Sequence, residues 1–269
     1  MKPEGLKIWH QSLTDLSAVP GYRQSLTAIA AYVGQPGTRV EIHGVVPGTF
    51  PAGTAPVIAL RSRWIEQLLA TQLIKNALTA EAEGYDAVSV SCFFDPGLEE
   101  ARELVGIPVV SACETSLTVA LGMGRHAVLT ALDAHQAVAL RRVVKRLGLQ
   151  DLVTAVVPLS PYITDLEIEA GVPIDDLVRR HELALATVEI SGPTVLIPAE
   201  GVLNAALSAA GIHSIAGLPV IDSFASVVAH AEMLSRLGAT TGIGLHTGAS
   251  HDDVRKHIET IAAVVLVRD

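Results

Sequence analysis

The sequence predicts an α/β fold with two pseudo-symmetric lobes, each a short, mainly parallel sheet flanked by helices, around a central cleft. Short continuous apolar runs, typical of buried parallel strands, alternate with stretches of helical periodicity. The chain is rich in Ala, Val, Leu and Gly and has only 4% aromatic residues, which suits helices packed closely on strands. Parts of its first half also recur in its second half.

Eight apolar runs are expected to be strands. They are residues 6–9, 40–43, 87–91, 108–111, 127–132, 153–159, 195–198 and 219–221. Between them, residues 62–84 carry apolar side chains at helical spacing and stop at Gly84, a typical helix end. Residues 133–147 begin at the N-cap candidate Asp133, and 173–190 form a third helix with proline in its first turn. This alternation implies right-handed crossovers.

The internal repeat involves two strands in each half of the chain. GIPVVSACETSL from Gly106 resembles GLPVIDSFASVV from Gly217, at an offset of 217 − 106 = 111. The strand VSVSC ending at Cys92 corresponds to VLIPA ending at Ala199, at an offset of 199 − 92 = 107. Although Gly–x–Pro–Val strands also arise by chance, two elements in the same order indicate two related lobes.

The repeat suggests a division of the chain. Residues 1–112 would form the first lobe, to which residues 225–269 return with a C-terminal helix, and residues 113–224 would form the second. Ligands of open parallel sheets bind beyond the carboxyl ends of strands. The ends of strands 88–91 and 195–198 should therefore line the cleft between the lobes.

Composition and charge narrow the function classes. Nineteen Lys and Arg against 28 Asp and Glu give a net charge of −9, so no nucleic-acid or membrane partner is expected, although a local patch could bind a small anion. Two cysteines exclude a disulfide framework. No apolar stretch reads as a signal peptide or membrane span, so we expect a cytoplasmic protein. His246 and His251 form no HExxH motif and no full dinucleotide fingerprint occurs, so neither a metal nor an organic cofactor is expected.

Cys92 is the leading candidate for chemistry. It follows strand 87–91 and precedes a turn beginning at Phe93 and a short acidic helix over 98–105. A helix N-terminus would lower the pKa of the thiol, and a thiolate acts as a base or nucleophile. A cysteine that only fills apolar space fits this position equally well. Ser91, its neighbour on the strand, is expected to face away from the thiol.

Polar residues near the ends of other strands would complete an anion-binding site. They are His10, Gln11, Ser12, Glu114, Thr115 and Thr130. Hydroxyls and helix N-terminal amides at such positions bind carboxylates or stabilise an enolate-like oxyanion. Each residue also suits a structural role, such as a helix cap or a hydrogen-bonded histidine.

The segment SVSCFFDPGLEEARELVGIPVV, residues 89–110, resembles the first active-site segment of the hydantoin racemases, within the aspartate/glutamate racemase superfamily. The similarity rests on the Cys–x–x–Asp–Pro–Gly core that begins at Cys92, on Ala-Arg-Glu-Leu and on Pro-Val-Val. VLIPAEGVLNAAL with GLPVID is a weaker match to the second segment, and IWHQS a looser match to a substrate-binding loop. The resemblance implies two pseudo-symmetric α/β lobes with the active site between them.

The second half departs from this pattern. Racemases of this group place a second cysteine after the second-half strand, so that one thiol stands on each face of the inverted carbon. Alignment on Gly201 puts Ala199 at that position, with Glu200 beside it. Cys113 follows a different strand and is interpreted as structural. Glu200 is either the second base, its pKa raised by desolvation, or a carboxylate favoured by a helix N-terminus.

These observations predict a cofactor-independent racemase or isomerase. Cys92 would transfer a proton or attack a carbon activated by a carbonyl, in a small carboxylate or a hydantoin- or imide-like substrate, with Glu200 opposite. Phe93, Ala199 and Gly201 would contact the substrate. A single-cysteine decarboxylase or hydrolase and a non-catalytic two-lobe binding protein remain open alternatives. We also expect a homo-oligomer.

Overall fold

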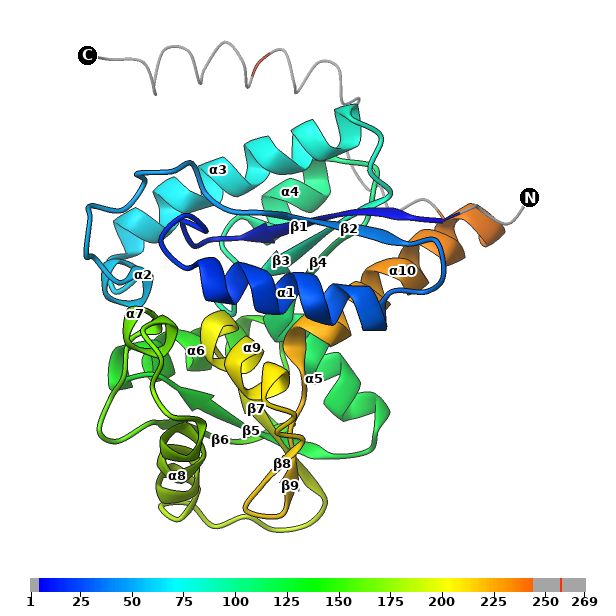
Figure 1. Ribbon diagram of the computed structural model, residues 1–269. Helices are drawn as coiled ribbons and strands as arrows, with labels where there is room; N and C mark the ends of the chain where they lie inside the picture. Colours follow the sequence, from blue (N-terminus) through cyan, green and yellow to red (C-terminus); the bar gives the residue numbers. More distant parts are fainter. Residues whose placement is uncertain (1–4, 244–256, 258–269) are drawn as a thin grey trace.

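Two parallel sheets organise the molecule, whose computed structural model describes residues 5–243 and 257 (Figure 1). The first sheet has the order β2-β1-β3-β4 and the second the order β6-β5-β7. Their strands are β1 (Lys7–Ser12), β2 (Arg39–His43), β3 (Ala87–Ser91), β4 (Val109–Ser111), β5 (His126–Ala131), β6 (Val153–Pro158) and β7 (Thr194–Pro198). These seven strands agree with the predicted runs to within a few residues.

The second sheet repeats the strand order of the first. β6-β5-β7 corresponds to β2-β1-β3, and a parallel bridge between Leu196 and Val220 occupies the place of β4 beside β3. The rest of the predicted strand 219–221 differs, because β9 (Leu218–Pro219) pairs antiparallel with β8 (Ser214–Ile215). Proline lacks the N–H that a ladder needs, which limits a longer pairing here. The predicted fold of two pseudo-symmetric α/β lobes is confirmed.

Helices cover both sheets. They are α1 (Pro20–Val33), α2 (Pro56–Ala59), α3 (Arg63–Ala82), α4 (Leu98–Leu104), α5 (Ala112–Gly122), α6 (Ala134–Arg146), α7 (Asp165–Glu169), α8 (Ile174–Leu185), α9 (Gly201–Ala209) and α10 (Ser223–Thr241). Ser62 caps α3 and Asp133 caps α6, the cap expected from the sequence. Helix α8 ends five residues before the predicted limit of 190, and Thr187 there donates to the carbonyl of Ala184.

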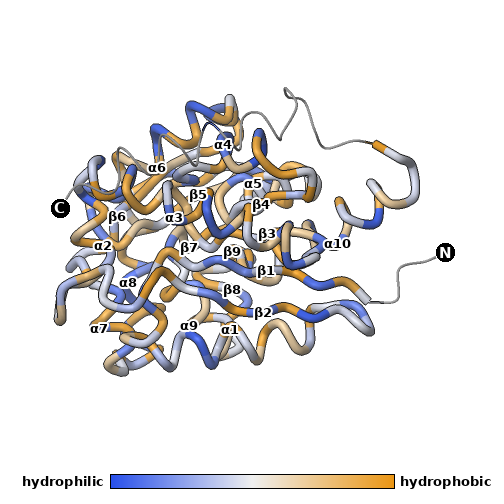
Figure 2. Tube along the Cα trace, turned by 90° about the horizontal axis from the view of Figure 1, so that it is seen from above, coloured by the Kyte–Doolittle hydropathy of each residue, from blue (hydrophilic) through white to orange (hydrophobic). Residues whose placement is uncertain are grey.

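The buried apolar side chains form a core made by the strands of both sheets and by the helices that pack on them. Figure 2 shows apolar stretches along the strands. Helix α10 runs back from the second lobe and packs against β3, β4 and α1, and the division of the chain into two lobes at the given residues stays a prediction. After residue 243, the structure describes only residue 257 of the chain. His246 and His251 therefore lie outside the described residues. Within the described ranges, no helix is long and apolar enough to cross a membrane.

Candidate functional site

A pocket of about 40 Å³ lies where the carboxyl ends of β3 and β7 face each other. Five of the residues singled out in the sequence line it together. They are Cys92 and Phe93 from the first lobe and Ala199, Glu200 and Gly201 from the second. The lining thus combines the two strand ends that the internal repeat relates, at the edge where parallel sheets bind ligands.

The other singled-out residues lie outside the lining of this pocket and bond to the protein itself. His10 is buried with Nδ1 2.9 Å from the Ser89 hydroxyl. The Gln11 side chain donates to the carbonyl of Ser12, whose own hydroxyl accepts from the amide of Thr14. A role in substrate binding for these residues stays a prediction.

Three residues further along the chain also lie outside the lining of this pocket. Glu114 pairs with Arg102 at 2.6 Å, and the Thr115 hydroxyl lies 3.0 Å from Nδ1 of His230. Thr130 is buried inside the second sheet, and its hydroxyl has no hydrogen-bond partner among the described residues. The contacts of Glu114 and Thr115 therefore suit structural roles, and substrate binding by the three residues stays a prediction.

Cys92 is only 7% exposed in the pocket. The nearby backbone amides of Phe94 and Asp95 act to lower the pKa of its thiol, as expected for a thiol before a helix. Burial nevertheless raises the pKa of the Cys92 thiol, with Asp95 and Glu66 adding to the effect. The expectation of a lowered pKa is therefore wrong for this closed pocket, because desolvation outweighs the two amides. The group stands in the pocket as a neutral thiol at physiological pH.

Ser91 lines the same pocket, which corrects the expectation that it faces away from the thiol. Strand β3 ends at Ser91, so the alternation of side chains does not extend to Cys92. The Ser91 hydroxyl lies 2.8 Å from the hydroxyl of Tyr22 on α1. A Cβ at Gly201 would lie 2.7 Å from that Tyr22 oxygen, so the first lobe can approach α9 this closely only at a glycine.

The position of Glu200 is compatible with both of the roles that the sequence left open to it. It is the N-cap of α9, where its carboxylate accepts from the amide of Leu203 at 2.7 Å. It also lines the pocket, and burial together with nearby Asp165 raises its pKa to about 7. A carboxyl with this pKa exchanges protons readily near neutral pH.

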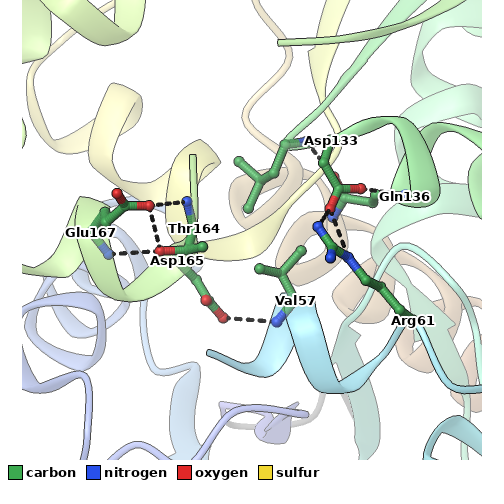
Figure 3. A network of polar contacts seen from close by, with 8 residues as sticks. Val57, Arg61, Asp133, Gln136, Thr164, Asp165 and Glu167 are labelled. Atoms are coloured by element: carbon green, nitrogen blue, oxygen red, sulfur yellow. Dashed lines mark hydrogen bonds and ion pairs between the residues drawn. The ribbon is translucent and has the colours of Figure 1, made fainter. Parts of the chain in front are cut away.

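Asp165 is a pocket residue that the sequence reading missed. It is 1% exposed and begins α7, whose capping box of Thr164 and Glu167 is a recognisable local signal for a helix start. Its Oδ2 accepts from the amide of Val57 at 3.3 Å, a contact between the lobes drawn in Figure 3. Burial raises the pKa of Asp165 to about 6, against the opposing effect of the Val57 and Leu166 amides.

The chain segment around α2 crosses from the first lobe onto the second. Val57 and Leu60 line the pocket, and Nε of Arg61 donates to Oδ2 of Asp133 at 3.0 Å (Figure 3). Asp133 in turn caps α6 through the amide of Gln136. The segment thereby closes one side of the pocket.

Cys113 lies on α5, fully buried and outside the pocket lining. Burial raises the pKa of its thiol well above the usual value. These surroundings agree with its interpretation as a structural residue. Among the described residues, no group of three or more His, Cys, Asp or Glu could hold a metal ion.

Comparison with known proteins identifies the family. The model of the Asp/Glu/hydantoin racemase family matches residues 17–231. The chain belongs to this family. A hydantoin racemase of Pseudomonas sp. strain NS671 is 30% identical over 202 residues, which are 75% of this chain and 76% of that relative.

Solved structures of other proteins have a similar fold. The allantoin racemase of Pseudomonas fluorescens is 26% identical with a TM-score of 0.67, and 87% of this chain and 92% of that one are covered. The allantoin racemase of Klebsiella pneumoniae is 21% identical with a TM-score of 0.69, covering 87% and 89% of the two chains. An arylmalonate decarboxylase, 19% identical, aligns with a TM-score of 0.54 over 85% of this chain and 92% of that one.

Proposed function

We propose that this chain is a cofactor-independent racemase that inverts a carbon next to a carbonyl, with Cys92 on one face of that carbon and Glu200 on the other. One observation carries the proposal. Cys92 and Glu200 follow equivalent strands of the two lobes and line the same pocket. A thiol and a carboxyl on opposite lobes provide the two proton-transfer groups that inversion requires.

The proposed reaction moves one proton on each face of the substrate. The Glu200 carboxylate takes the proton from the carbon, and the electron pair of the broken C–H bond passes into the neighbouring carbonyl. The neutral Cys92 thiol then delivers its proton to the opposite face and is left as a thiolate. For the other enantiomer the thiolate takes the proton and the Glu200 acid delivers one.

The pocket favours a hydantoin or another cyclic imide over a free carboxylate as the substrate. Among the described residues that line it, none is Lys, Arg or His, whereas Asp165 and Glu200 both contribute carboxyl groups. A substrate carboxylate would meet negative charge there without a cation to pair with. The N–H groups of a neutral imide ring can instead donate to carboxylate oxygens. The names of the relatives, hydantoin racemase and allantoin racemase, agree with this preference.

We propose that the narrow pocket widens before a substrate enters. Its volume of about 40 Å³ is far below the roughly 300–1,000 Å³ of typical small-molecule sites. The segment around α2, held to the second lobe through Val57 and Arg61, is the wall that we propose to move.

A cytoplasmic location and a homo-oligomeric state remain proposals on sequence grounds.

The test is conversion of an enantiopure 5-substituted hydantoin in deuterated water, followed by chiral chromatography and proton NMR. A racemase gives inversion with deuterium at the reacting carbon, above the rate without enzyme. Arylmalonates offered in parallel test the decarboxylase alternative through release of carbon dioxide, and ring opening of the hydantoin would indicate a hydrolase. Binding without any conversion would leave the two-lobe binding protein and contradict the proposal.

A further inference from the structure

Helix α7 of the second lobe supplies N-terminal caps to two helices of the first. The carboxyl of Asp165 accepts from the Val57 amide of α2. Four residues on, the carboxyl of Glu169 accepts from the amides of Gly21 at 2.6 Å and Tyr22 at 2.9 Å at the start of α1. Neither α1 nor α2 has a side-chain cap of its own, and both begin with proline. The two acids therefore hold the lobes together in the same way.

Only one of the two acids enters the pocket. Asp165 is buried and shares the lining with Glu200 and Cys92, whereas Glu169 is half-buried and lies outside it. Within the described residues, no Lys or Arg forms an ion pair with Asp165. Asp165 thus brings an uncompensated second carboxyl beside Glu200.

Resting on the proposed function, we propose that Asp165 is a positioning residue that shares one proton with Glu200 and so makes the Glu200 carboxylate a stronger base opposite Cys92. Two carboxyls in one dry pocket cannot both ionise without strong repulsion. The amides of Val57 and Leu166 donate to Asp165 and favour its ionised form. When the pair holds a proton, that proton therefore resides mainly on Glu200, and proton uptake from the substrate needs the form in which Glu200 is ionised.

The remaining groups around Glu200 do not offset this repulsion. Tyr22 from α1 and Cys92 after β3 face the pair, and both are neutral in their buried positions. The Leu203 amide favours the Glu200 anion, yet burial and Asp165 together keep the pKa of Glu200 near 7. Proton uptake from a carbon acid is most effective when the pKa of the base lies close to the working pH.

The shared proton balances the proposed reaction. Before proton uptake, both carboxyls are ionised and Cys92 is a neutral thiol. The substrate proton passes to Glu200, where the carboxyl pair then holds it, and the Cys92 proton passes to the other face of the carbon, which leaves a thiolate. The reverse sequence restores both groups, and no further reactant is consumed.

The experiment compares Asp165→Asn with Glu169→Gln in the full chain. Asn keeps an acceptor for the Val57 amide but cannot carry the charge, and Gln likewise keeps one acceptor oxygen for the amides of Gly21 and Tyr22 outside the pocket. We expect Asp165→Asn to lower kcat for a hydantoin about tenfold or more, and to move the acidic limb of the kcat profile to lower pH. Glu169→Gln should keep kcat and the pH profile. Equal losses in both variants, or an unchanged profile in Asp165→Asn, would overturn the proposal.

An infrared pH titration tests the pair without any turnover. The titration is run in an Asp95→Asn background, because Asp95 is a further buried carboxyl with a pKa of about 7. In that background a buried protonated carboxyl should disappear near neutral pH. Adding Asp165→Asn should move this transition to lower pH and adding Glu200→Gln should abolish it, whereas adding Glu169→Gln should leave it in place. A background protein without such a transition would contradict the shared proton even if racemisation occurs. If the transitions follow expectation and no hydantoin is converted, the pair stands and the proposed function fails.

Discussion

The two strand ends that meet in the pocket occupy equivalent places in the two lobes but carry different acids. After β3, Cys92 is separated from α4 by a turn in which Asp95 and Gly97 adopt left-handed conformations, with φ of 52° and 70°. After β7, Glu200 leads directly into α9 and caps it. The thiol therefore sits ahead of a turn, whereas the carboxyl is tied to the amides of its helix.

This difference separates what the fold determines from what the local chain determines. The repeated strand order brings both residues to the same pocket. The charge state then depends on surroundings. Burial raises the pKa of the Cys92 thiol far above neutrality. Burial also raises the pKa of Glu200, but the amides at the start of α9 oppose this rise, and the pKa reaches about 7. Two residues that follow equivalent strands thus differ: Cys92 stays protonated, whereas Glu200, one place beyond the counterpart of Cys92, titrates near neutral pH.

The largest expected effect is that of Cys92→Ala, which would remove the proton donor that we place opposite the Glu200 carboxyl. We expect racemisation of a hydantoin to fall about a thousandfold or more, because the face served by the thiol loses its proton donor. Chiral chromatography measures the rate. Cys113→Ala is the matched control, since this buried cysteine lies outside the pocket lining, and it should retain activity. Similar losses in both variants would indicate that the cysteines matter only for packing.

Glu200→Gln tests the other side of the comparison with a smaller effect. Gln keeps an oxygen acceptor for the Leu203 amide, so the α9 cap is largely preserved while the base is lost. We expect kcat to fall about a hundredfold. In the wild type, kcat should decline as the pH falls through about 7 and Glu200 becomes protonated, and this decline should be absent in the variant. A full wild-type rate in Glu200→Gln would leave the carboxyl with only its capping role.

The sequence predicts the strand ends well, because each is a local feature. The apolar runs before Cys92 and Ala199 can be recognised from neighbouring residues alone. The repeat that relates the two runs can be seen by comparing their sequences. Asp165 could not be found in this way, since its contact with Val57 spans 108 positions and its place in the pocket depends on how the lobes pack. The same limit explains the wrong direction for the pKa of Cys92, because burial in a closed pocket is a property of the tertiary structure.

Gly201→Ala tests how closely the two lobes must approach. An added Cβ would lie 2.7 Å from the Tyr22 oxygen and 3.0 Å from the Ser91 oxygen, so the hydrogen-bonded pair must move. We expect the free energy of unfolding to drop by about 2 kcal/mol, as overpacking in a filled interior does. Urea denaturation measures it. The control is Gly122→Ala, because an added Cβ there meets open space and the φ is ordinary. Gly211→Ala would be unsuitable, because the φ of 71° at Gly211 would strain any residue with a side chain. Gly122→Ala should leave stability nearly unchanged, and an equal loss there would contradict the close approach at Gly201.

Asp95→Asn should have the smallest effect and concerns an acid in the turn after the thiol. Asp95 is buried, with Arg146 3.6 Å from its carboxylate, and burial raises its pKa to about 7. Because this value lies above the unfolded one, the folded state binds the extra proton between roughly pH 4 and 7, and the stability from this group is lost as the pH rises through that range. The neutral amide of Asn removes this cost and tolerates the left-handed φ. We expect the free energy of unfolding at pH 8 to increase by about 1 kcal/mol, with a flatter dependence between pH 4 and 7. A less stable variant at pH 8 would mean that the pairing of Asp95 with Arg146 outweighs its desolvation.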